Sequence, residues 1–120
     1  SGNNERIFIC CDFKDKLVQL SSYSIMSQNK SPNSRHLKNW AIEVSQDGQT
    51  WIEIDRRENE EKLNGAKVTA TFKISPENKE FYRFIRLIET GCCWHSGTQY
   101  DGIFSMIEFF GKLRLSKINK

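Results

Sequence analysis

The strongest constraint on the fold is a period-two pattern in residues 36–51, which read HLKNWAIEVSQDGQTW. From Trp40 to Val44 every second residue is large and apolar, whereas the residues between them are small or charged. Alternation of this kind gives a segment one apolar face for a core and one polar face for water. The pattern therefore predicts a half-buried β-strand.

A turn and a returning strand follow this first strand. Asp47 and Gly48 form a pair that favours the positive φ angles of a tight hairpin. Trp51, Ile52 and Ile54 then resume the apolar pattern. We expect a β-hairpin with a tight turn, in which Trp51 begins the second strand.

Similar short apolar segments recur along the chain, and residues typical of turns separate them. No amphipathic helix of useful length emerges between them. Many short strands at this spacing favour an all-β sandwich or jelly roll. The strand candidates are residues 7–13, 18–27, 37–45, 50–54, 68–74, 82–89 and 103–113.

The parity of residues on these strands predicts which side chains form the core. Residues that share the apolar face should be buried together, because successive side chains of a strand point to opposite faces. The positions expected to be buried are Trp40, Ile42, Val44, Ile85, Leu87, Ile107 and Phe109.

Four short motifs occur in a characteristic order. They are the strand end ICCDF at 9–13, the hairpin at 40–51, the strand RFIRL at 83–87 and the strand IEFFG at 107–111. Together they resemble the coagulation factor V/VIII type C, or discoidin, family over residues 7–113. The form to which they are most similar is the divergent one of intracellular eukaryotic multidomain proteins.

This resemblance implies a discoidin-like jelly-roll β-sandwich that belongs to the galactose-binding-like folds. Family members usually carry a further N-terminal segment with one strand and one ligand-facing loop, so the resemblance implies a sandwich that lacks this strand. We expect one domain at 7–113, a tag remnant or linker at 1–6 and a C-terminal tail at 114–120.

Charge and hydropathy argue against two classes of function, nucleic-acid binding and membrane spanning. The 18 basic and 15 acidic residues are mixed along the chain and leave a net charge of +3, which does not favour a nucleic-acid partner. The sequence contains no run of apolar residues long enough to predict a membrane span. The charged run at 55–62 is typical of a solvated loop in which Arg56 or Arg57 pairs with a nearby acid. Contact with a partner is the alternative interpretation of that run.

The four cysteines form two adjacent pairs, Cys10–Cys11 and Cys92–Cys93. An even count is compatible with disulfides in a secreted domain. Secreted relatives of the discoidin family join their two ends by a disulfide, and no cysteine follows Cys93 in this chain. We therefore expect reduced thiols and a cytoplasmic, intracellular location.

Two polar loops are the candidate ligand-binding segments. In the first, residues 28–36, Arg35 can grip a carboxylate or phosphate, and neighbouring polar side chains can bind hydroxyl groups. In the second, residues 91–102, aromatic side chains stand where no core requires them and can stack on a sugar ring. The alternatives are a solvated connection and a tryptophan that folds back as a lid. The predicted ligand-binding residues are Asn29, Asn33, Arg35, His36, Trp94, His95 and Tyr100.

Catalytic and metal-binding patterns do not emerge from the sequence. The two histidines and the scattered acids form no triad with a nucleophile, and no glycine-rich phosphate loop occurs. Cys92, Cys93, His36 and His95 lack the spacing of a zinc site. We expect no enzyme activity, no cofactor and no bound metal.

These observations favour a non-catalytic module that recognises a carbohydrate or another small polar ligand through loops at one end of a sandwich. The alternative is a protein-interaction or substrate-recognition module of a multidomain intracellular protein of the BTB or ubiquitin-ligase type. As an isolated domain the chain is expected to be a monomer.

Overall fold

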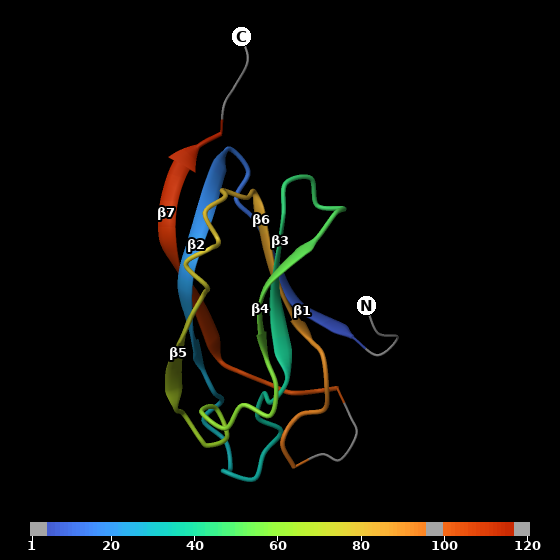
Figure 1. Ribbon diagram of the computed structural model, residues 1–120. Coiled ribbons are helices and arrows are strands. Elements are labelled where there is room, and N and C mark those ends of the chain that lie inside the picture. Colours follow the sequence, from blue (N-terminus) through green and yellow to red (C-terminus); the bar gives the residue numbers. More distant parts are fainter. Residues whose placement is uncertain (1–4, 96–99, 117–120) are drawn as a thin grey trace.

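Seven strands form two antiparallel sheets in the computed structural model, which describes residues 5–95 and 100–116. Figure 1 shows the sheets as two facing layers, with orders β1-β6-β3-β4 and β5-β2-β7. The described residues contain no helix, and the predicted all-β sandwich is confirmed. The strands are β1 (Arg6–Asp12), β2 (Lys16–Met26), β3 (Trp40–Ser45), β4 (Ile52–Arg57), β5 (Thr69–Lys73), β6 (Phe84–Glu89) and β7 (Met106–Leu115).

The core lies between the two sheets, where the predicted parity holds on β3 and β6. These two strands pair with each other at the centre of their sheet. Their inward side chains are at most 1% exposed, as a central strand covered by a second sheet requires. The residues confirmed as buried are Trp40, Ile42, Val44, Ile85 and Leu87.

A register shift explains an irregular apolar pattern on β2. Val18 and Leu20 face the core, but the next buried side chains are Tyr23 and Ile25, so the period of two slips by one residue. A shift in the pairing with β7 falls between Leu20 and Ser22. Because a bulge inserts one extra residue, it returns the following apolar residues to the core face.

The expected burial of Ile107 and Phe109 on β7 is wrong in degree. Both residues pack against the core, but they are only half-buried. The reason is position, because β7 is an edge strand with β2 on one side only. Parity identified their face correctly, whereas the extent of burial depends on how much of that face the opposite sheet covers.

The turn between β3 and β4 is wider than expected. Val44 pairs with Ile52, so Trp51 precedes the strand that it was predicted to begin. Of the Asp47–Gly48 pair, only Gly48 has a positive φ, at 79°. The Asp47 carboxylate instead accepts backbone N–H bonds from Gln49 and Thr50 at 2.8 and 2.9 Å. A side-chain cap of this kind stabilises a longer loop.

A buried polar chain links the two sheets. The indole N–H of Trp40 on β3 donates to the Tyr23 hydroxyl on β2 at 2.8 Å. That hydroxyl donates to the Asp55 carboxylate on β4 at 2.5 Å, and Arg57 holds the same carboxylate through two N–H bonds. Burial, followed by the hydrogen bond to Asp55, raises the pKa of Tyr23 well above its ordinary value, so the phenol stays protonated and donates.

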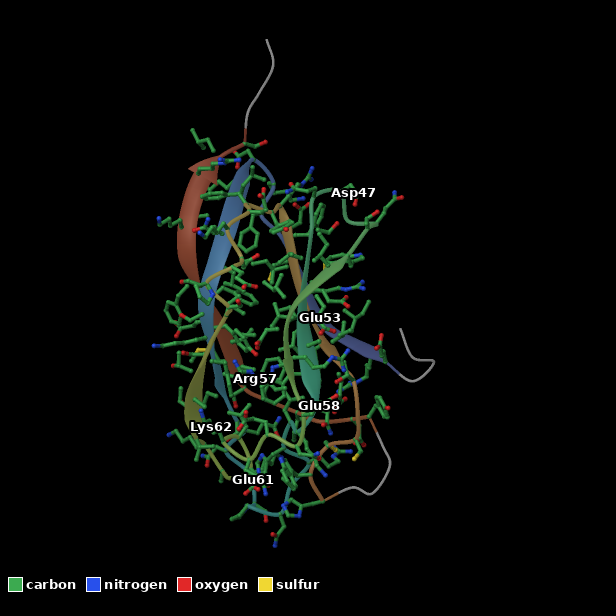
Figure 2. All side chains as sticks on the ribbon, viewed as in Figure 1. Asp47, Glu53, Arg57, Glu58, Glu61 and Lys62 are labelled. Carbon is green, nitrogen blue, oxygen red and sulfur yellow. The ribbon has the colours of Figure 1, made fainter. Side chains whose placement is uncertain are left out.

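The prediction that Arg56 or Arg57 pairs with a nearby acid is confirmed, because Arg57 binds Asp55 at 3.0 Å and Arg56 binds Glu53 at 2.8 Å. Arg86 binds Glu43 across the outer face of its sheet at 2.7 Å. The charged run at 55–62 is only partly a loop, because its first three residues belong to β4. Figure 2 shows Glu53 and Arg57 on that strand, and Glu58, Glu61 and Lys62 at the lower end of the molecule.

An ion pair at the other end of the sandwich joins the end of β1 to the residue that precedes β6. Arg83 donates two hydrogen bonds to the Asp12 carboxylate, at 2.7 and 3.0 Å. These bonds lower the pKa of Asp12 far below its ordinary value of 3.8. A carboxylate with a lowered folded-state pKa stabilises the fold above its unfolded-state pKa, and this stabilisation is lost as the pH falls further.

Asp12→Asn should therefore make the stability of the domain less dependent on pH in acid. We expect the free energy of unfolding to decline less steeply below about pH 4 in the variant than in the parent chain. Urea titrations at a series of acidic pH values measure this slope. Asp15→Asn, which removes an exposed carboxylate from the adjacent turn, is the matched control. Equal slopes for the parent and Asp12→Asn would contradict the prediction.

The strand bounds differ slightly from the expected limits of the domain. β1 begins at Arg6 and β7 continues to Leu115, so each reaches into a segment expected to be a linker or tail. Residues 1–4 and 117–120 of those segments lie outside the described residues. No helix in the part of the chain that the structure describes is long and apolar enough to cross a membrane.

Candidate functional site

Three loops meet at one end of the sandwich, which we call the loop end. They comprise residues 28–36, residues 58–67 and the described residues 90–95 and 100–105, which lie together at the bottom of Figure 1. The first precedes β3, the second follows β4 and the third joins β6 to β7. Because neighbouring strands are antiparallel, the start of β3 lies at the same end of the sheets as the ends of β4 and β6. The three loops therefore meet at that end.

Backbone hydrogen bonds hold the first and third loops together. The Trp94 N–H donates to the His36 carbonyl at 2.9 Å, and the Ile103 N–H donates to the Arg35 carbonyl at 2.8 Å. His36 and Ile103 also form an isolated parallel β-bridge. The two loops predicted from sequence are therefore adjacent, and their relative position is set by main-chain contacts.

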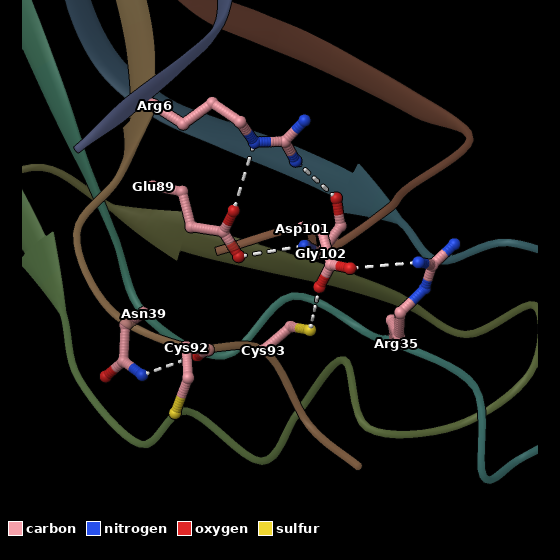
Figure 3. Close-up of polar contacts among 8 residues, drawn as sticks. All are labelled: Arg6, Arg35, Asn39, Glu89, Cys92, Cys93, Asp101 and Gly102. Carbon is pink, nitrogen blue, oxygen red and sulfur yellow. Dashed lines mark hydrogen bonds and ion pairs between the residues drawn. The ribbon is translucent and has the colours of Figure 1, made fainter. Parts of the chain in front are cut away.

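Arg35 lies on the exposed rim of the loop end, as a ligand-binding arginine should. Its Nη1 donates to the Asp101 carboxylate at 2.9 Å, and the other oxygen of Asp101 accepts from the Cys93 thiol at 3.1 Å (Figure 3). About half of the Arg35 side chain is exposed, at 51%. The guanidinium is thus oriented by Asp101 while part of it remains accessible to a bound molecule.

His36 does not fit the binding role predicted for it. The residue is fully buried, and its Nε2 lies 3.0 Å from the Ser31 carbonyl, to which it must donate. Its Nδ1 has no hydrogen-bond partner among the described residues. His36 therefore supports the first loop from within. Sequence could not distinguish this role, because polarity alone does not tell which side of a loop faces the core.

Trp94 is half-buried and already makes contacts within the protein. Its indole N–H donates to the Glu60 carbonyl at 3.0 Å. The Lys38 ammonium lies 4.4 Å from the ring centroid, in the range of a cation–π contact. The ring therefore joins the second and third loops, as the lid interpretation requires, and keeps part of its surface exposed.

The remaining predicted residues lie in the first and third loops. His95 is exposed and has a positive φ of 63°, and its Nε2 lies 3.0 Å from the Asn64 side-chain oxygen. Asn29 and Asn33 are exposed in the first loop, and Tyr100 is half-buried in the third. Six of the seven predicted residues thus keep exposed surface at the loop end.

Asn39 is a structural centre of the loop end that sequence reasoning missed. Its side-chain nitrogen donates to the Cys92 carbonyl at 2.9 Å, and its side-chain oxygen accepts from the Asn59 N–H at 2.9 Å. A Cβ atom on Gly91 would lie 2.9 Å from Asn39. One short amide therefore joins the second and third loops, and the adjacent glycine was the only sequence signal for this close approach.

A buried carboxylate anchors the third loop to the sheets. Glu89 is fully buried, where its carboxylate accepts the Gly102 N–H at 3.0 Å and lies 3.3 Å from the Arg6 guanidinium. Arg6 also donates to the Gly102 carbonyl at 2.8 Å (Figure 3). Burial raises the pKa of Glu89, against the effects of both partners. A Cβ atom on Gly102 would lie 2.7 Å from the carboxylate, so a larger residue there would displace the Glu89 side chain from this position.

The loop end offers hydrogen-bonding groups and a partly exposed aromatic ring. It combines a guanidinium, an imidazole, carboxamides and a tryptophan, which is the usual mixture in a site for polar ligands. No group of three or more potential metal ligands occurs among the described residues.

Comparison with solved structures identifies a similar fold. The C-terminal domain of a chitobiase from Bacteroides fragilis matches with a TM-score of 0.61 at 15% sequence identity. The match covers 92% of this chain and 64% of the other, so this chain spans less than two thirds of that domain. At this identity the likeness shows the fold alone. No protein-family model matches the sequence, and no curated protein matches it.

Proposed function

We propose that this domain is a non-catalytic recognition module whose loop end binds a carbohydrate or another small polar ligand. The observation that carries the proposal is the arrangement of Arg35, Trp94 and His95 on adjoining loops. A guanidinium and an imidazole supply hydrogen-bond donors, and a partly exposed indole supplies an apolar surface. Sugars present the same combination of hydroxyl groups and apolar ring faces.

The hydrogen bonds that connect the described parts of the loops support this function. Main-chain bonds, the Asn39 amide and the buried Glu89 carboxylate fix the loops relative to one another. A binding surface that is ordered before the ligand arrives loses less conformational entropy on binding. The described parts of the loops are thus held together at one end of the sandwich.

One structural neighbour and the resemblance of the sequence motifs support the same ligand class. The structural neighbour is a domain of a chitobiase, an enzyme named for a sugar substrate. The four ordered motifs resemble the discoidin family, whose fold belongs to the galactose-binding-like class. We also propose, from that resemblance, that the parent protein is eukaryotic and intracellular.

Arg35→Ala and Trp94→Ala should each weaken ligand binding by about 1–3 kcal/mol, because each leaves a ligand group unpaired or uncovered. A glycan array identifies the ligand, and calorimetric titration measures the two variants. Thermal melting separates the roles of Trp94, since loss of a lid would lower stability as well. Binding that neither substitution changes would refute the proposed site.

Trp51→Ala is the matched control for Trp94→Ala. Trp51 is also half-buried and also lies under a cation, because the Arg86 guanidinium is 3.9 Å from its ring centroid. It adjoins the Asp47 loop at the opposite end of the sandwich (Figure 2). The control should leave binding unchanged even where it alters stability.

A protein partner is the second candidate for the loop end. The second loop presents exposed side chains of both signs, among them Glu58, Glu61 and Lys62. A surface of mixed charge spread over several loops also fits the rim of a protein interface. Affinity capture with the parent chain and with Arg35→Ala, alongside the glycan array, distinguishes the two candidates. A protein captured by the parent alone, with no glycan bound, would favour the second.

A further inference from the structure

The outer edge of β7 is the most exposed apolar feature of the sandwich. β7 ends the order β5-β2-β7, and no strand pairs with its other side in the described part of the chain. Leu113 and Leu115 are 61% and 70% exposed. Both share the parity of the core-facing Ile107 and Phe109, so they lie on the same inner face of the sheet. The opposite sheet does not cover this end of that face. Unpaired edges of this kind are templates for pairing with another chain.

The sequence of β7 is self-complementary about Gly111. When two copies pair antiparallel with Gly111 opposite Gly111, residues at equal distances before and after it become cross-strand neighbours. Ile107 then faces Leu115, and Phe109 faces Leu113, on the inner side. On the outer side, Glu108 faces Arg114 and Phe110 faces Lys112. Each apolar residue of the inner side thus meets another, and the acid meets a base.

We propose that two copies of this chain associate through their β7 edges, in an antiparallel pair centred on Gly111. The two three-stranded sheets then become one continuous sheet of order β5-β2-β7-β7-β2-β5. The pairing covers the exposed Leu113 and Leu115 with Phe109 and Ile107 of the other copy. Such an interface is isologous, as expected for a two-fold dimer. The dimer replaces the monomer expected from sequence.

The charged residues of β7 also have another physical explanation. Outward-pointing charges on an edge strand can prevent pairing, and Lys112 and Arg114 could act in this way. The Arg114 guanidinium presently lies 4.3 Å from the centroid of the Phe81 ring. A contact of this kind at an exposed site is worth about 0.5–1 kcal/mol. It is therefore weak enough for Arg114 to turn toward Glu108 of another copy.

Charge-reversal variants distinguish edge charges that pair two copies from edge charges that prevent pairing. Light scattering coupled to size exclusion should show the parent chain approaching twice its mass of 14.0 kDa as concentration rises. Glu108→Arg places arginine opposite arginine, and Arg114→Glu places glutamate opposite glutamate. Each single variant should raise the dimer dissociation constant at least about tenfold, which corresponds to about 1.4 kcal/mol.

Mixing the two single variants provides the most specific measurement. In a dimer of one copy of each, both cross-strand positions again pair an acid with a base. An equimolar mixture should therefore form a heterodimer at concentrations at which each variant alone is monomeric. Lys73→Glu, a charge reversal at an exposed position on the opposite edge of the same sheet, should dimerise like the parent.

The outcomes decide the proposal directly. A parent chain that stays monomeric at all concentrations overturns the proposed dimer. Lys112 and Arg114 would then prevent edge-to-edge pairing. Single variants that dimerise like the parent, or a mixture that does not associate, overturn the Gly111 register. All variants change exposed side chains, so circular dichroism and melting should confirm an unchanged fold.

Discussion

Replacing Ile42 by alanine should lower the free energy of unfolding by about 2–5 kcal/mol. Ile42 is fully buried on β3, at the centre of its sheet and beneath the other sheet. Removing the outer carbons of Ile42 loses the free energy gained by burying them and leaves a cavity between the two sheets. Because the neighbouring strands pair with β3 on both sides, the backbone has little freedom to collapse into the space. Urea unfolding followed by tryptophan fluorescence measures the loss.

Ile52→Ala is the matched control for this substitution. Ile52 lies on the adjacent strand β4 and is 48% exposed, so the same change removes carbons that water already contacts. The control should alter stability by no more than about 0.5 kcal/mol. A loss of that small size for Ile42→Ala would mean that the two sheets do not pack as described.

Replacing Tyr23 by phenylalanine should destabilise the domain by about 1–3 kcal/mol, although it removes a single oxygen atom. The Tyr23 hydroxyl accepts the Trp40 indole N–H and donates to Asp55. Trp40 is fully buried, so its N–H would be left without water or another partner. Asp55 would keep its bonds from Arg57. Most of the cost should therefore come from the unpaired indole.

A double-mutant cycle tests this explanation. In the Tyr23→Phe background, Trp40→Phe removes the unpaired N–H and should cost less than it does in the parent chain. Equal costs in the two backgrounds would show that the hydrogen bond contributes nothing. Tyr82→Phe is the control, since Tyr82 is 7% exposed and its hydroxyl makes no hydrogen bond within the described residues.

The buried hydrogen-bond chain in the core and the Glu89 contacts at the loop end have the same structural effect. In both, a buried polar group joins elements that are far apart in sequence. The Trp40–Tyr23–Asp55 chain connects the sheets in the core, and Glu89 connects the third loop to β1 through Arg6. Such groups are costly when unpaired, so they favour the one arrangement in which all partners meet.

Strand positions and the all-β class followed from the sequence alone. Each of the seven observed strands overlaps one expected from alternating apolar residues, because local alternation reflects a sheet with one buried face. The inward parity of Ile42 and Ile85 was predictable for the same reason. So was the polar character of the two loops that became the rim of the candidate site.

Only the tertiary structure decided how these pieces meet. The burial of His36, the use of Trp94 as a bridge to Glu60 and the central role of Asn39 all depend on contacts between loops distant in sequence. The local sequence around a polar loop residue looks the same whether its side chain faces water or a neighbouring loop. The contacts that distinguish the two arise only when both sheets have paired, because strand register determines which loop ends become neighbours.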